Sequence, residues 1–263
     1  MRPPSLLPGL LAHLLAPGLL LALAACSSAP APGTPAADDD EATGPRGSTV
    51  LVYTRTAGFR HGSIPDGIAC MGELAAELGL EVRATEDPAA FTDEGLADVA
   101  AVVFLSTTGD VLDEAGQGAL ERYVQSGGGW LGVHAATDTE YDWPWYTGLA
   151  GAQFASHPKV QPAQLWKVHD HASVAFLPEP WVRTDEWYNF QERSDAVTPL
   201  LMLDEASYEG GTNGEHHPAA WMHEYDGGRA WYTAGGHTEQ SFGEELFRRH
   251  LREGLRWVAR VEP

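Results

Sequence analysis

Between residues 48 and 134, short apolar runs alternate with amphipathic stretches, and this alternation constrains the fold more than any other feature of the sequence. The apolar runs lie at 48–54, 80–85, 98–106 and 129–134. The amphipathic stretches 61–79 and 113–126 carry apolar residues at helical spacing. Near-continuous runs of Val, Leu and Ala indicate strands that are covered on both faces. The pattern predicts one α/β domain built on a doubly wound, mostly parallel sheet.

The second half of the chain has a different character and is rich in Trp, His and Gly. Further strand-like pieces lie at 164–168 and 199–203. Residues 219–234 read as two strands joined at Asp226-Gly227-Gly228, a sequence typical of a β-hairpin. Residues 242–261 predict an amphipathic helix that closes the domain. We therefore expect the parallel sheet to be extended by C-terminal hairpin additions.

The N-terminus has the pattern of a bacterial lipoprotein signal. Arg2 is the only charge before Cys26, and the stretch between them is mostly Leu, Ala and Gly. It ends in Leu-Ala-Ala-Cys, which resembles a lipobox. A transmembrane anchor is the alternative, but two prolines and a histidine interrupt the run, and a spanning helix needs about 20 apolar residues. We predict a signal peptide at 1–25, lipidation of Cys26 and export, with the membrane contacted through the lipid anchor only.

A tether follows the lipidation site. Residues 26–47 are dominated by Ser, Ala, Pro, Gly and acidic residues, a composition that cannot bury enough surface to offset the entropy of ordering. The folded domain is therefore expected at 48–263. It holds a single cysteine, Cys70, so no disulfide can form within it.

Charge and glycine patterns exclude two common ligand classes. The formal net charge is −21 and only two lysines are present, so the chain has no basic face for nucleic acid. Residues 127–132 match GxGxxG, but this motif enters a predicted strand instead of following one and opening a helix. No NAD site is inferred.

The loops after three predicted strands are the expected place for chemistry. In open α/β sheets, sites form at the carboxyl ends of the strands. The loops are 55–61, 107–110 and 134–138. His134 takes the place of the nucleophile in a strand–turn–helix elbow, where an imidazole would act as a metal ligand or proton-transfer group. A buried histidine that bonds to backbone is the alternative.

Five motifs along the domain together resemble one family. They are AGFRH (57–61), GGGWLGVHAATD (127–138), FASH (154–157), DEWY (185–188) and GRAWYTAGGH (228–237). The chain is similar to the ThuA-like (trehalose utilisation) family from Val50 to about Val258. The resemblance implies a flavodoxin-like fold related to the class I glutamine amidotransferases. His134 falls where those enzymes carry a catalytic cysteine, so glutaminase activity is not expected.

The same resemblance implies a pocket and a class of substrate. The residues carried over by the motifs are His61, His134, Asp138, His157, Glu186, Tyr188 and His237. The family is associated with bacterial sugar metabolism, including 3-keto derivatives of disaccharides. A lipoprotein N-terminus is not general in the family, and it argues against a cytoplasmic pathway role.

These observations lead to one main hypothesis, a carbohydrate-active enzyme with a small-molecule sugar as partner. A divalent metal, zinc or similar, would be held by His61, His134, His157 and His237. The catalytic group would comprise His134, Asp138 and Glu186, with the carboxylates as acid or base. Substrate contacts are assigned to Arg60, Asp110, Trp143, Trp187 and Tyr188, although tryptophans are more often core residues. A tethered, non-catalytic carbohydrate-binding module is the alternative.

Overall fold

The structure is a computed structural model, and it describes residues 46–262. The signal peptide, the lipidation site at Cys26 and nearly all of the tether that the sequence predicts lie outside these residues. Across 46–262, no helix combines the length and apolarity that a membrane crossing needs.

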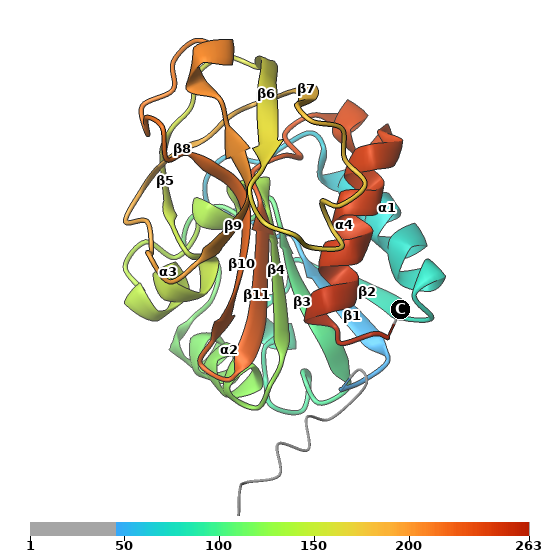
Figure 1. Cartoon of the computed structure of the whole chain (residues 1–263). Coiled ribbons are helices and arrows are strands. Elements are labelled where there is room, and N and C mark those ends of the chain that lie inside the picture. The colour runs from blue at the N-terminus through green and yellow to red at the C-terminus, as the bar shows by residue number, and fades with distance from the viewer. Residues whose placement is uncertain (1–45, 263) are drawn as a thin grey trace, which may run out of the picture. The chain divides into compact units, whose positions relative to one another are not determined.

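A nine-stranded sheet forms the centre of the described domain, in the order β2-β1-β3-β4-β11-β10-β9-β6-β7 (Figure 1). Its first five strands run parallel to one another. They are β2 (Glu81–Thr85), β1 (Thr49–Tyr53), β3 (Val99–Leu105), β4 (Gly129–Val133) and β11 (Gly228–Thr233). The doubly wound, mostly parallel sheet expected from the sequence is confirmed.

Antiparallel strands extend the sheet beyond β11. They are β10 (Pro218–Tyr225), β9 (Thr198–Leu203), β6 (Gln161–Lys167) and β7 (Trp181–Asp185). β10 and β11 form the predicted hairpin, with Tyr225 paired to Gly228. A separate two-stranded sheet joins β5 (Gln153–Ser156) to β8 (Asn189–Gln191). Strands β5, β7 and β8 were not predicted, because apolar and polar residues do not alternate clearly along their sequences.

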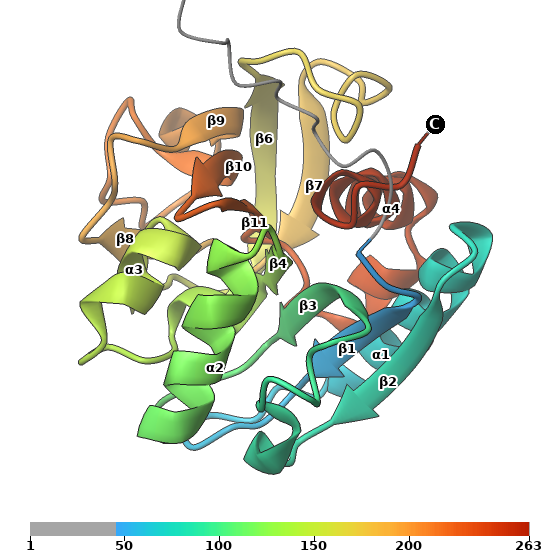
Figure 2. The ribbon, with the colours of Figure 1, turned by 90° about the horizontal axis from the view of Figure 1, so that it is seen from below.

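Helices cover both faces of the sheet (Figure 2). On one face lie α1 (Ile64–Glu77) and α4 (Glu245–Val258), and on the other lie α2 (Glu114–Gln125) and α3 (Pro144–Ala150). Alternate residues of β1 show this arrangement, since Val50 and Val52 pack with α1 and α4 while Leu51 and Tyr53 pack with α2. Short 3₁₀ helices are η1 (Pro88–Ala90), η2 (His134–Thr137), η3 (Glu205–Ser207) and η4 (Glu239–Gly243).

Two predicted helices begin later than the sequence indicates. α1 begins at Ile64 instead of residue 61, with Pro65 in its first turn, where a missing N–H costs nothing. His61 is therefore a loop residue. α4 begins at Glu245 instead of residue 242, because Thr238 caps the preceding η4 by accepting from the Ser241 N–H.

Candidate active site

Four side chains converge beyond the carboxyl ends of β1, β4, β7 and β11. His61 follows β1 in the loop before α1, and His134 comes directly after β4. Glu186 follows β7, and His237 follows β11. One ligand atom from each of these four residues lies within 4.8 Å of the others. We call this group the His₃Glu cluster.

Close distances join the ligand atoms of the His₃Glu cluster. His134 Nε2 lies 3.2 Å from His61 Nε2 and 3.2 Å from His237 Nδ1. Glu186 Oε2 lies 3.1 Å from His237 Nδ1 and 3.6 Å from His134 Nε2. A tetrahedral zinc site with metal–nitrogen bonds of about 2.0–2.1 Å separates its ligand atoms by roughly 3.3 Å. The spacing of the cluster therefore suits a small divalent cation.

His134 is oriented by its backbone and by its second ring nitrogen. Its Nδ1 lies 2.9 Å from the Ala234 carbonyl, which can only accept, so Nδ1 carries the proton. In the neutral ring, Nε2 is then a free lone pair that points into the cluster. The backbone of His134 has a φ of 52°, a left-handed conformation that few non-glycine residues adopt. This is the strained elbow expected at the turn from β4 into η2.

Two members of the cluster, His61 and Glu186, are held in the protonation state that binds a metal. Burial, reinforced by the neighbouring His134 and His237, lowers the pKa of His61 to about 3. Burial alone would raise the pKa of Glu186, but its close contacts with His134 and His237 outweigh burial and lower the pKa to about 2. The hydrogen bond to Glu186 raises the pKa of His237 against the effect of burial. A neutral imidazole and an ionised carboxylate are the forms that bind metal.

A cavity of about 280 Å³ opens above the His₃Glu cluster. Beyond cluster members, its wall contains Phe59, Asp138, Phe154, His157 and Tyr188. The Tyr188 ring lies 4.3 Å from the His134 ring, centroid to centroid. This volume is near the lower limit of small-molecule pockets, which begin at roughly 300 Å³. The cavity therefore suits one ring of a sugar better than a long oligosaccharide.

Asp138 and His157 are the polar groups of the cavity wall. Asp138 accepts a hydrogen bond from the Tyr141 hydroxyl at 2.6 Å. Burial raises the pKa of Asp138, although that hydrogen bond opposes the shift. His157 Nδ1 lies 2.9 Å from Glu186 Oε1. The other carboxylate oxygen, Oε2, is the one that contacts His134 and His237. His157 thus contacts the cluster from the wall, whereas the sequence assigned it to the metal itself.

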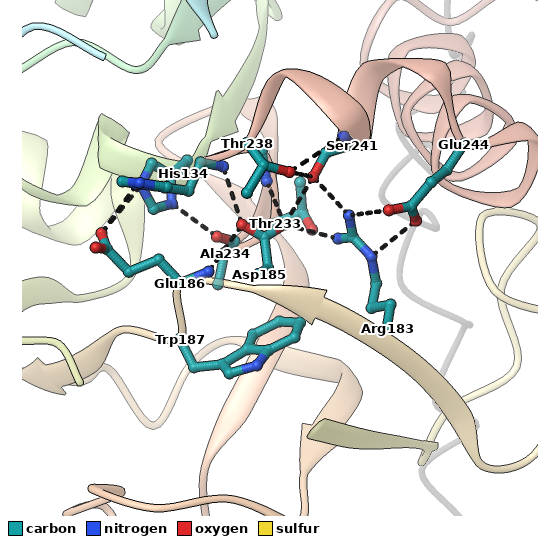
Figure 3. A network of polar contacts seen from close by, with 12 residues as sticks. His134, Arg183, Asp185, Glu186, Trp187, Thr233, Ala234, Thr238, Ser241 and Glu244 are labelled. Atoms are coloured by element: carbon teal, nitrogen blue, oxygen red, sulfur yellow. Dashed lines mark hydrogen bonds and ion pairs between the residues drawn. The ribbon is translucent and has the colours of Figure 1, made fainter. Parts of the chain in front are cut away.

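The structure places four of the predicted substrate contacts away from the cavity. Arg60 forms an exposed ion pair with Glu86, and Asp110 is exposed on its loop. Trp143 stacks on Trp145 in the layer of α2 and α3. Trp187 is 1 % exposed in the core and points away from the cluster (Figure 3). Its neighbour Tyr188 reaches the cavity because successive residues point to opposite sides of an extended chain.

Sequence reasoning missed Phe59, Phe154 and Asp185. Phe59 precedes His61 by two residues and is 66 % exposed, which is unusual for so large an apolar side chain. Phe154 begins the FASH motif, so its place on the cavity wall could have been suspected from its neighbour His157. Asp185 is fully buried beside Glu186, and nothing in a single sequence distinguishes its role from that of its neighbour.

Comparison with protein families identifies one family over most of the chain. The model of the ThuA family, described as trehalose utilisation, matches residues 49–258. The chain belongs to this family, which is associated with trehalose utilisation and carbohydrate metabolism. Among curated proteins, none matches the chain.

Solved structures share the fold at low sequence identity. A ThuA-like protein from Bacteroides uniformis is 23% identical, with a TM-score of 0.68, over 86% of this chain and 95% of that one. A ThuA-like protein from Parabacteroides merdae is 20% identical, with a TM-score of 0.67, over 81% of this chain and 90% of that one. A cytoplasmic protein from Salmonella typhimurium is 13% identical, with a TM-score of 0.57, over 80% of this chain and 99% of that one. These likenesses support the fold and carry no assignment of activity.

Proposed function

We propose that this chain is a metal-dependent, carbohydrate-active enzyme that is exported and anchored by a lipid on Cys26. The observation that carries the proposal is the His₃Glu cluster, in which three ring nitrogens and one carboxylate oxygen converge at the base of a cavity. Trehalose utilisation, the description of the family, supports a sugar as the small molecule. 3-Keto derivatives of disaccharides are the first substrates to examine.

The donor set fits a divalent ion on chemical grounds. Imidazole nitrogen and carboxylate oxygen are ligands of zinc and of similar ions, and a catalytic site keeps one coordination position open for water or substrate. His61, His134, Glu186 and His237 would hold it. When bound, such an ion acts as a Lewis acid that polarises a carbonyl or hydroxyl oxygen, or lowers the pKa of water.

The residues of the wall supply the remaining functions. Asp138 faces the cavity, and burial raises its pKa above the usual range of a carboxyl group, which favours a role in taking up and returning a proton. Phe59, Phe154 and Tyr188 offer ring faces against which the apolar face of a sugar can pack. His157 holds the second oxygen of Glu186 and so limits rotation of that carboxylate.

Elemental analysis of the full-length chain, purified without a polyhistidine tag, tests the metal. We expect near-stoichiometric zinc, manganese, iron or nickel. Absence of metal, even after incubation with each ion, would overturn the metal-dependent part of the proposal.

Turnover of sugars by the loaded protein tests the activity. We expect product from a 3-keto disaccharide and none from an Asp138→Asn variant that still binds the metal and the sugar. Saturable binding of the sugar without product over a long incubation would instead support a carbohydrate-binding module. Lipid attachment is tested separately, since a Cys26→Ala chain should leave the membrane fraction and lack the lipid mass.

A further inference from the structure

One short backbone segment, residues 234–237, contacts or contains residues that position the His₃Glu cluster. The Ala234 carbonyl accepts from His134 Nδ1 at 2.9 Å. The Gly236 carbonyl accepts from Ser63 Oγ at 2.9 Å, and Ser63 follows His61 by two residues. His237 is itself a member of the cluster. The position of this segment therefore affects three of the four candidate ligands.

The carboxylate of Asp185 holds that segment in place. Its Oδ2 accepts from the Gly236 N–H at 2.9 Å, and its Oδ1 accepts from the His237 N–H at 3.0 Å. Oδ1 also accepts from the Glu186 N–H at 2.9 Å. Asp185 is 0 % exposed, so water does not compete for these bonds. One side chain thus connects the backbone of Glu186, the remaining candidate ligand, to the segment that supports the other three.

The far side of the carboxylate is fixed by a buried polar network (Figure 3). Ser241 Oγ donates to Asp185 Oδ2 at 3.0 Å, and Arg183 Nη1 lies 3.1 Å from the same oxygen. Arg183 also pairs with Glu244, whose carboxylate lies 3.1 Å from Arg183 Nε. Gly235 packs so closely on Arg183 that a Cβ atom there would overlap the guanidinium. The network is therefore packed directly against the 234–237 segment.

We propose that Asp185 is a positioning residue for the His₃Glu cluster, acting by fixing residues 234–237 and Glu186 in one arrangement. The inference rests on the proposed metal-dependent function. Residues that orient metal ligands without contacting the metal themselves typically contribute 10- to 100-fold to metal affinity. A carboxylate is needed here because every contact of Asp185 is with a donor, and an amide would direct its own N–H groups against some of these donors.

Titration of the full-length chain with Co²⁺, followed by its visible absorption, tests the inference. We expect Asp185→Asn to weaken Co²⁺ binding by roughly 10- to 100-fold and to change the absorption spectrum of the bound ion. Glu244→Gln is the matched control, because it makes the same change from carboxylate to amide in the same network. Glu244 contacts Arg183 but no candidate ligand, so its variant should bind Co²⁺ as the wild type does.

The outcomes separate this inference from the proposed function. Equal affinity and identical spectra for Asp185→Asn and Glu244→Gln would overturn the positioning role and leave the metal site standing. A wild-type chain that binds no ion would overturn both. If Asp185→Asn fails to fold, Ser241→Ala decides the matter, because it removes one restraint on Oδ2. Weaker Co²⁺ binding by a folded Ser241→Ala chain would support the role, and unchanged binding would overturn it.

Discussion

His134 and His250 are alike in burial and in the hydrogen bond of Nδ1, but they lie in different parts of the molecule. Both are 0 % exposed. Both have Nδ1 against a backbone carbonyl, that of Ala234 at 2.9 Å for His134 and that of Ser173 at 2.8 Å for His250. His134 lies at the carboxyl edge of the sheet, whereas His250 lies on α4 among the rings of Trp181, Trp231 and Phe247.

The difference between them is at Nε2. In His250, Nε2 lies 3.2 Å from the Thr233 hydroxyl, which can donate or accept and so satisfies a neutral ring. In His134, Nε2 faces two other imidazoles and a carboxylate. One shared proton cannot satisfy all of these groups, whereas a cation can. Burial and a first hydrogen bond therefore do not distinguish a structural histidine from a functional one, and the partner of the second nitrogen does.

The largest expected effect is loss of metal in His134→Asn. Asn tolerates the left-handed backbone that residue 134 adopts, so the fold should persist while the ligand nitrogen is lost. We expect affinity to fall at least about 1000-fold, or about 4 kcal/mol, which exceeds the effect of an outer residue. Metal titration and thermal melting of the metal-free protein measure the two properties. If the variant kept its affinity for the metal, His134 would have a structural role like that of His250.

The opposite variant, His250→Ala, should lower stability and leave the metal in place. It removes a buried ring and leaves the Ser173 carbonyl without its donor, a loss of about 3 kcal/mol in the free energy of unfolding. Denaturant unfolding of the metal-free chain measures this loss, and Co²⁺ titration should give the wild-type affinity. A large fall in affinity would break the comparison, because it would show that the two histidines act together.

The pH dependence of stability should also report on His250. Burial, with smaller contributions from Arg183 and His171, lowers its pKa from 6.5 to about 3. Below pH 6.5, His250 binds a proton in the unfolded chain but stays neutral in the folded chain. The contribution of the neutral His250 to the free energy of unfolding is therefore fully present above pH 6.5, and it falls by about 1.4 kcal/mol per pH unit toward pH 3. His250→Gln should remove this part of the slope in urea unfolding between pH 7 and 4.5, and an unchanged slope would contradict the buried neutral ring.

The smallest effect is expected from Phe59→Ala, on the functional side of the comparison. The ring is 66 % exposed and packs edge-on against His61, with centroids 4.9 Å apart. Its removal should change the free energy of unfolding by less than about 0.5 kcal/mol. Sugar affinity should fall about fivefold, or about 1 kcal/mol, if the ring contacts the sugar. Val182→Ala is the control, because Val182 on β7 is also a large exposed apolar residue but does not line the cavity. This variant should change neither quantity. Unchanged sugar binding in both variants would remove Phe59 from the binding surface.

Much of the fold could be predicted from the sequence because its signals are local. The runs that became β1, β3 and β4 are almost entirely apolar, and the helices α1 and α2 that follow β1 and β3 show apolar residues at helical spacing. Parallel strands bring their carboxyl ends to one edge, so His61 and His134 could be expected near each other. Trp187 shows the limit of such reasoning, since its neighbour Tyr188 has an equally aromatic side chain and lies on the opposite side of the chain.

The sequence by itself determined the layered α/β core, the hairpin and the histidines at the sheet edge, because these follow from periodicity and chain direction. Only the tertiary structure decided how Glu186 and Asp185 reach those histidines. Glu186 and Asp185 lie at the end of β7, the antiparallel strand at the outer edge of the sheet. In the chain they are about 50 residues from both His134 and His237. Contacts over such separations depend on how the sheet is extended and packed, and no local pattern encodes that.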